Sequence, residues 1–282
     1  MLWEQQIVNT ERGSFEMFVR GEGPPLAVTH LYSEFNQTGD YFAQSFTEYN
    51  RVFLINLRGC GESEEPHETY QFSMLESVLD LESIRRALGF SQWSFAAHST
   101  GAMLGVLYGV HASPFIRDMI LVGGGAREYM SDTPSCIYHT GHAKYEQMQR
   151  YLELLKREDL SEEERKEVKR SRTQLSLYRP ELHDAYFSSG IEKGLSAKRL
   201  NFFSRELHIF DLTRKLPLID CDVLIACGRH DVQCPLLFSE EMKDRIPKAR
   251  LIIFEESNHY PFLEEKENFR RTVRDWRLRK EK

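Results

Sequence analysis

One serine stands where an apolar strand gives way to a helix, in the stretch Ala97-His98-Ser99-Thr100-Gly101. A hydroxyl on such a turn is exposed at the end of a sheet, and small residues two positions before and after it let strand and helix approach closely. The same stretch also fits an ordinary N-cap serine. The local sequence therefore leaves two interpretations of Ser99, a nucleophile and a helix cap.

Two groups that a serine nucleophile requires follow later strands. Asp231 comes just after the apolar run 223–226, and His259 lies in the loop after the run 250–254. Sites of open α/β sheets form at the carboxyl ends of the strands, so these side chains are expected to meet there. An imidazole with a pKa near ~6.5 takes and returns the serine proton, and a carboxylate fixes its tautomer. Ser99, His259 and Asp231 are the predicted nucleophile, base and acid.

The elements that position these residues alternate between strands and helices, which is typical of an α/β sheet. Apolar runs predict buried strands, and helical periodicity predicts the segments between them. Strands are expected at 26–28, 52–57, 93–97, 118–122, 223–226 and 250–254, and helices near 39–49, 72–88, 101–110, 237–245 and 263–279. An antiparallel hairpin is expected at 4–9 and 15–19 with Phe15, Met17 and Val19 on one face, and the helix 72–88 is expected to bury Leu75, Val78, Leu79, Ile84 and Leu88.

The alternation stops between 126 and 212, where the sequence is charged and helical and shows no strand pattern. Tyr145 and Met148 begin one helical spacing, and Ser161 with Glu164 forms a capping box that opens another helix. The charged run 157–172 is expected to form the solvated face of these helices. We therefore predict a helical cap over 126–212, inserted into a core domain made of 1–125 and 213–282.

Composition excludes several classes of protein. The 282 residues suffice for a large core, and a formal net charge of −6 gives no basic excess for nucleic acid. No apolar run reaches the ~18 residues of a membrane span, and the start of the chain does not resemble a secretory signal. Five cysteines without a CxxC pair predict neither disulfides nor zinc, and His139 and His142 lack further metal ligands. We expect a cytoplasmic protein with no metal.

The chain order serine, aspartate, histidine is that of the α/β-hydrolases, and the sequence resembles this superfamily over essentially its whole length. The turn NLRGCGESEEP, residues 56–66, is similar to the turn after the fourth strand in the proline iminopeptidase-like branch, peptidase family S33, with Asn56 in place of an acid. The resemblance implies a mostly parallel eight-stranded sheet flanked by helices, an inserted helical cap, and no cofactor.

The resemblance also implies an oxyanion hole made of two backbone N–H groups. Thr100, which follows the nucleophile, is expected to give one. Relatives read H-G-x-P or H-G-G-P-G where this chain reads His30-Leu31-Tyr32-Ser33, so Tyr32 is expected to give the other, with Leu31 as the nearby alternative. The bulky side chains there should narrow the acyl pocket. His30 and His98 are candidate pocket residues, and His98 is equally compatible, like His230, with a packing role.

These features predict a serine hydrolase that cleaves an ester or amide bond of a small-molecule substrate through an acyl-enzyme, as a carboxylesterase or an S33-type aminopeptidase. The scaffold leaves alternatives open: a carbon–carbon bond hydrolase, a cofactor-free perhydrolase, or a small-molecule receptor with a vestigial triad. A serine nucleophile argues against haloalkane dehalogenases and epoxide hydrolases, which use aspartate. We expect a monomer or a homodimer.

Overall fold

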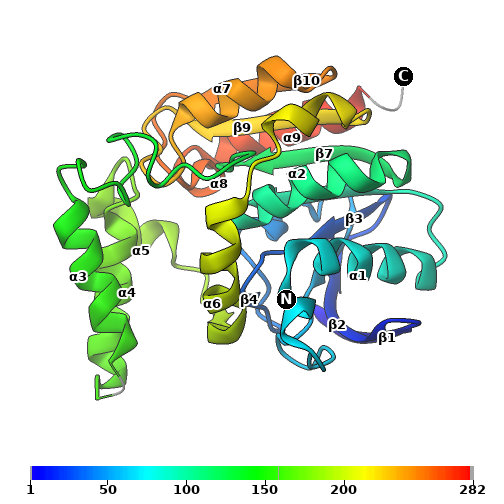
Figure 1. Ribbon diagram of the computed structural model, residues 1–282, viewed down its shortest axis with the longest axis horizontal. Helices are drawn as coiled ribbons and strands as arrows, with labels where there is room; N and C mark the ends of the chain where they lie inside the picture. Colours follow the sequence, from blue (N-terminus) through cyan, green and yellow to red (C-terminus); the bar gives the residue numbers. More distant parts are fainter. Residues whose placement is uncertain (1, 158, 280–282) are drawn as a thin grey trace.

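The computed structural model describes residues 2–157 and 159–279 and confirms the predicted α/β architecture (Figure 1). Its strands are β1 Glu4–Thr10, β2 Gly13–Arg20, β3 Pro25–Val28, β4 Ser33–Glu34, β5 Arg51–Ile55, β6 Trp93–His98, β7 Ile116–Val122, β8 Gly194–Leu195, β9 Asp222–Gly228 and β10 Ala249–Phe254. Its α-helices are α1 Met74–Ala87, α2 Thr100–Ala112, α3 Tyr145–Lys156, α4 Glu162–Gln174, α5 His183–Tyr186, α6 Ala197–Glu206, α7 Leu236–Arg245, α8 Pro261–Glu264 and α9 Lys266–Leu278.

Eight strands form one sheet in the order β1-β2-β5-β3-β6-β7-β9-β10. The hairpin β1–β2 is antiparallel, as expected, and β2 also pairs antiparallel with β5. Every other pairing in this sheet is parallel. The carboxyl ends of β6, β7 and β9 therefore lie side by side, which is where the predicted nucleophile and acid begin.

The strands are buried on both faces, because alternate residues enter two different cores. In β5, Phe53 and Ile55 pack into a core with α1, α2 and α7, whereas Val52 and Leu54 pack into a second core with α8 and α9. Val273 and Trp276 of the C-terminal helix α9 face that second core. Apolar side chains on both faces explain why the strand sequences read as continuous hydrophobic runs.

Helix α1 buries a different face from the predicted one. Leu75 and Leu79 are 44% and 41% exposed, although Val78 and Ile84 are buried as expected. The helix instead buries ionic groups: Asp80 receives hydrogen bonds at 3.0 Å from Nε and Nη2 of Arg58, and also pairs with Arg12. Apolar periodicity could not reveal a helix face that is buried through ion pairs.

Two further expectations were wrong in detail. The helix expected near 39–49 is reduced to a 3₁₀ turn, Ala43–Phe46, because the carboxylate of Asp40 accepts hydrogen bonds from Phe42 N and Ala43 N and fixes a local turn. The segment 126–212 also contains a strand, since β8 pairs antiparallel with β4. A strand of two residues is too short to show alternation.

The helices α3 to α6 all fall between β7 and β9 in the chain. Figure 1 shows α3 and α4 as a pair set off from the sheet, with α6 close to β4. Helix α4 starts at the predicted capping box: the hydroxyl of Ser161 accepts from Glu164 N, and the Glu164 carboxylate accepts from Ser161 N. Within the described residues, no helix combines the length and apolarity needed to cross a bilayer.

Asn56, which replaces an acid of the family pattern, lies at the centre of a buried polar network. Its amide donates to a carboxylate oxygen of Glu16 at 2.6 Å and to Phe35 O at 3.0 Å, and its oxygen accepts from Phe35 N at 2.8 Å. Glu16 is itself buried and also accepts from Glu62 N at 3.0 Å. The neighbouring Glu16 carboxylate explains why position 56 holds an amide. The Asn56 amide donates a hydrogen bond to Glu16, whereas a second carboxylate at this position would be repelled by Glu16.

We expect Asn56→Asp to lower the free energy of unfolding by about 1–3 kcal/mol, because a buried donor becomes an acceptor facing Glu16. In this variant, repulsion between the new carboxylate and Glu16 raises the pKa of one of the two groups. The loss in free energy of unfolding should therefore be full at pH 8 and should shrink as the pH falls, because the pair takes up a proton. Urea unfolding at pH 8 and pH 5 measures the effect. The double variant Asn56→Asp/Glu16→Gln should recover stability, and equal losses at both pH values would contradict this account.

Candidate active site

Ser99 is held in a backbone conformation that serine rarely adopts. It follows β6 and occupies the N-cap position of α2, with φ 59° and ψ −127°. It is the single non-glycine residue with positive φ in the described part of the chain. Its N–H donates to Val122 O at 2.8 Å, and its side chain is partly exposed. Such a conformation costs about 1–3 kcal/mol and clusters at functional sites. The hydroxyl does not cap the helix, so the N-cap interpretation is not supported.

Gly101 and Ala97, the small residues two positions after and before Ser99, lie in different surroundings. A methyl group at Gly101 would lie 2.6 Å from Thr29 O and 3.3 Å from the Ala97 side chain, so the start of α2 touches the backbone that leads to His30. Ala97 belongs to strand β6 and is fully buried. Position 97 therefore does not require glycine, and its alanine fits the turn.

Asp231 and His259 lie in contact, as predicted. The Nδ1–H of His259 donates to the two carboxylate oxygens of Asp231 at 3.0 and 2.9 Å, and both side chains are buried. The carboxylate also accepts from Gln233 N and Cys234 N, each at 2.9 Å. With Nδ1 engaged by Asp231, Nε2 of His259 carries the free lone pair of a general base.

Two glycines join this pair to the serine turn. A methyl group at Gly123, where φ is 55°, would lie 3.0 Å from Oδ2 of Asp231 and 3.2 Å from Nδ1 of His259. A methyl group at Gly124 would lie 3.1 Å from Ser99 O. The loop after β7 therefore packs as bare backbone between the serine turn and the acid–base pair. This contact accounts for the first two glycines of the run Gly123-Gly124-Gly125.

His98, a predicted pocket residue, lies against His259. The ring centroids are 4.5 Å apart, and Nε2 of His98 donates to His259 O at 2.8 Å. Burial lowers the pKa of His98 well below its usual value, and the charge of His259 lowers it further. A neutral His98 supports the His259 loop without adding a second positive charge. Its contact with substrate stays a prediction.

The loop that holds His30, Leu31 and Tyr32 adjoins the start of α2. Nε2 of His30 lies 3.1 Å from the Thr100 hydroxyl, and its Nδ1 lies 2.9 Å from the Ser33 hydroxyl. Burial lowers the pKa of His30 well below its usual value, followed by the charge of Lys193. The loop is thus attached through a neutral imidazole to the residue after Ser99.

The three residues predicted for the oxyanion hole are brought together but differ in setting. Leu31 is buried in the core, whereas Tyr32 is partly exposed and stacks edge-on with His30 at 4.7 Å. Tyr32 N lies 3.5 Å from Nδ1 of His30, at the limit of a hydrogen bond. This N–H is weakly engaged, so it is free to find a better acceptor. The oxyanion roles of Tyr32, Thr100 and Leu31 stay predictions.

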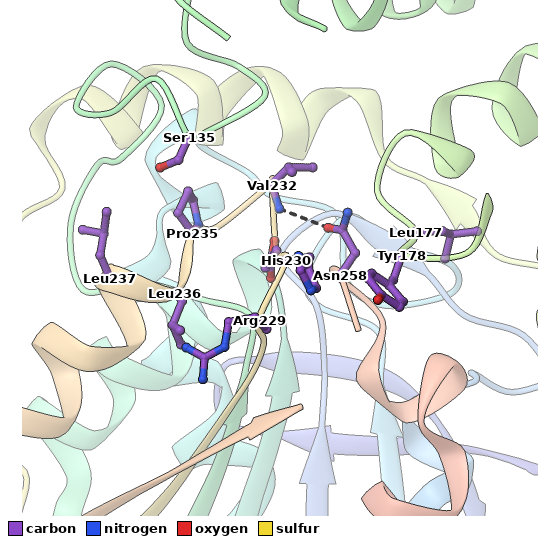
Figure 2. Close-up of a pocket in the computed structure, with 11 residues that line it drawn as sticks. Ser135, Leu177, Tyr178, Arg229, His230, Val232, Pro235, Leu236, Leu237 and Asn258 are labelled. Atoms are coloured by element: carbon purple, nitrogen blue, oxygen red, sulfur yellow. Dashed lines mark hydrogen bonds between the residues drawn. The ribbon is translucent and has the colours of Figure 1, made fainter. Parts of the chain in front are cut away.

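A crevice of about 470 Å³ opens behind the acid, at the loops after β9 and β10 (Figure 2). His230, an exposed residue, lines it and stacks on Tyr178 with ring centroids 4.6 Å apart, so its packing role stays a prediction that this contact fits. Figure 2 also shows the hydrogen bond from Val232 N to Asn258 Oδ1, 3.0 Å long, which ties the two loops together. The crevice therefore borders the support of the acid–base pair and contains neither Ser99 nor His259.

Two contacts from the inserted segment were not foreseen. His259 N donates to Ser176 O at 3.2 Å, just past the end of α4, and Arg199 of α6 donates to Leu31 O. Neither residue belongs to a motif, and each partner is distant in the chain, so the sequence carries no signal for these contacts.

The five cysteines offer no competing nucleophile. All five are free and buried. Burial raises the pKa of Cys60 and of Cys136 to about 12 and that of Cys221 to about 11. Since the thiolate is the reactive form, thiols with such pKa values are inert at neutral pH.

Comparison with known proteins agrees with the observed fold. A family model described as the alpha/beta hydrolase fold matches residues 30–266. The solved structure of an alpha/beta fold family hydrolase from Bacillus anthracis str. Sterne is 39% identical and superimposes with a TM-score of 0.94 over 98% of this chain and 99% of that chain. A proline iminopeptidase of Heyndrickxia coagulans is 23% identical over 94% of both chains. A pimeloyl-(acyl-carrier protein) methyl ester esterase of Nitrosomonas europaea is 24% identical over 91% of this chain and 96% of its own.

We expect Gly101→Ala to destabilise the protein by about 1–3 kcal/mol, because the added methyl group meets the backbone oxygen of Thr29. The matched variant Ala97→Gly removes a methyl group on the other side of the same turn and should cost only about 0.5–1 kcal/mol, mainly through chain entropy. Urea unfolding of the two variants makes the comparison. If Ala97→Gly were the more damaging change, the contact between α2 and the Thr29 backbone would not be limiting.

Proposed function

The chain belongs to the α/β-hydrolase fold family, and on that premise we propose that it is a serine hydrolase that cleaves an ester bond of a small substrate through an acyl-enzyme. The observation that carries the proposal is the arrangement at the ends of β6, β7 and β9. The strained serine turn packs against Gly124, and the buried Asp231–His259 pair packs against the adjacent Gly123.

Each residue receives a role from its geometry. Ser99 attacks the carbonyl carbon while Nε2 of His259 takes the hydroxyl proton, and Asp231 stabilises the imidazolium that forms. The N–H groups of Thr100 and Tyr32 bind the oxyanion of the tetrahedral intermediate. His259 then protonates the leaving alkoxide. A water molecule, deprotonated by the same imidazole, releases the acid and restores Ser99.

Charge around the site favours an ester over the free amine of an aminopeptidase substrate. Burial raises the pKa of Tyr138 and Tyr260, and the positive charge of Arg172 on the last turn of α4 opposes that rise in both. Two carboxylates, Asp231 and Glu264, raise the pKa of Tyr260 further. Asp231 accepts a hydrogen bond from His259, and the Glu264 carboxylate accepts hydrogen bonds from three backbone N–H groups. Neither acid is available to bind a substrate ammonium.

An S33-type aminopeptidase is the second candidate. It is supported by the similarity to a proline iminopeptidase over 94% of both chains and by the turn 56–66. The similarity to a methyl ester esterase supports the ester proposal with comparable coverage. The charges described above are the reason that we propose the ester first.

We expect Ser99→Ala to lower turnover of p-nitrophenyl butyrate by at least about 10³-fold and to abolish labelling by a fluorophosphonate, because the attacking oxygen is lost. Asp231→Asn should lower kcat on the order of 10³–10⁴-fold, since the amide no longer fixes the required tautomer of His259. Ser135→Ala, an exposed serine beside the crevice, is the matched control and should retain full turnover and labelling.

These measurements also separate the enzyme from a receptor with a vestigial triad. Labelling of Ser99 without turnover on ester and aminoacyl panels would favour the receptor. Turnover that survives Ser99→Ala would refute the serine mechanism.

We expect p-nitrophenyl butyrate to have a kcat/KM at least about tenfold above that of prolyl-p-nitroanilide, which corresponds to roughly 1.4 kcal/mol.

Mono-p-nitrophenyl glutarate carries a carboxylate that the positive charge of Arg172 attracts. Arg172→Gln should therefore lower kcat/KM for this ester about threefold to tenfold relative to the butyrate. Arg165→Gln, on the same helix, is the control. Faster cleavage of the prolyl substrate would favour the aminopeptidase.

A further inference from the structure

Arg199 of helix α6 is a buried cation whose direct partners are neutral. Its side chain is 2% exposed. Its Nε donates to Leu31 O, one Nη donates to Arg58 O at 2.9 Å, and the other donates to the Ser77 hydroxyl at 2.8 Å. Two of these acceptors are main-chain oxygens of core loops. Arg199 is delivered by the inserted segment, so it joins that segment to the core.

Such an arrangement is costly, because a charge taken out of water is ordinarily balanced by an opposite charge in contact with it. Burial lowers the pKa of Arg199 below its ordinary value. The ion pairs found among residues 2–157 and 159–279 do not include Arg199. The nearby carboxylate of Asp80 is bound instead by Arg58 and Arg12. The guanidinium is therefore directed at peptide groups rather than at an acid.

The oxygen that Arg199 binds belongs to the peptide whose N–H is that of Tyr32. In a planar trans peptide, C=O and N–H point in opposite directions, so a donor fixed on Leu31 O also fixes the direction of the Tyr32 N–H. A charged donor forms a stronger hydrogen bond than a neutral one and polarises the peptide. Arg199 thus orients this N–H and makes it a better donor.

Residues that precede Arg199 also bind the loop of residues 30–34. We call residues 194–199 the clamp segment. Ser196 N donates to Tyr32 O at 2.9 Å, and its hydroxyl donates to Gly59 O at 3.1 Å. Strand β8, the start of the clamp segment, pairs with β4, which ends the loop. The clamp segment therefore contacts the loop of residues 30–34 along most of its length.

We propose that Arg199 is a positioning residue for the oxyanion hole, and that the clamp segment holds the Leu31–Tyr32 peptide so that the Tyr32 N–H faces the carbonyl attacked by Ser99. The inference rests on the proposed serine mechanism. Relatives shape this loop with glycine and proline, whereas this chain has Leu31, Tyr32 and Ser33 and holds the loop from outside. The Tyr32 N–H lies 3.5 Å from Nδ1 of His30, and the proposal requires it to give up this weak contact for the oxyanion when substrate reacts.

The test compares Arg199→Met and Arg199→Lys with Ser77→Ala. Arg199→Met removes the donor to Leu31 O and should lower kcat for p-nitrophenyl butyrate about tenfold to hundredfold, with KM within about twofold, because the oxyanion forms only after binding. Arg199→Lys keeps one charged donor and should recover part of kcat. Ser77→Ala removes only the contact with the helix α1 hydroxyl, so it should leave kcat within about twofold.

A transition-state readout separates positioning from general stability. The inhibition constant of a trifluoromethyl ketone, which forms a tetrahedral adduct with Ser99, should rise by the same factor as kcat/KM falls in the Arg199 variants. The pH midpoint of kcat/KM should stay unchanged, since His259 is untouched. If Arg199→Met does not fold, the lysine variant carries the same comparison.

Wild-type kcat in Arg199→Met together with unchanged inhibition would overturn the proposal, as would a loss confined to KM. Failure of the serine mechanism looks different, because it would appear in the wild-type protein as turnover that does not depend on Ser99. The two results are therefore distinguishable in the same set of measurements.

Discussion

The whole site depends on the close approach of backbone at the carboxyl ends of β6 and β7. Gly123 and Gly124 leave no side chain between the serine turn and the acid–base pair, so the buried Asp231–His259 contact sits directly against the sheet. Parallel strands bring these ends to one edge, and the cores on both sides of the sheet prevent them from separating. The strain at Ser99 persists because this packing leaves the turn no alternative.

Much of this site could be predicted because its signals are local. Asp231 and His259 each follow an apolar run that ends at the same edge of the sheet, so their proximity could be predicted from their positions in the chain. The hairpin, the central strands and the capping box at Ser161 were predicted for the same reason, since a strand or a cap is specified by a few adjacent residues. The structure places these elements within a few residues of their predicted bounds.

The rest depends on contacts that no short stretch of sequence encodes. Leu75 and Leu79 follow apolar periodicity and yet face solvent, because Asp80 turns the helix toward its arginine partners. The strand pair β4–β8 and the hydrogen bond from Arg199 to Leu31 join segments far apart in the chain, and neither has a pattern of its own. Polar groups buried through partners are therefore where sequence patterns fail, since the partner decides the burial.

The hydrogen bond from Arg199 to Leu31 O also has a consequence for folding during synthesis. The two residues are 168 positions apart. At roughly 5–20 residues per second of synthesis, Arg199 emerges on the order of ten seconds or more after Leu31. Contacts of such long range also form late in folding, because their loop-closure entropy must be met first. A nascent chain therefore exposes Leu31 and Ser99 well before Arg199 can bind the loop, and Asp231 and His259 emerge later still.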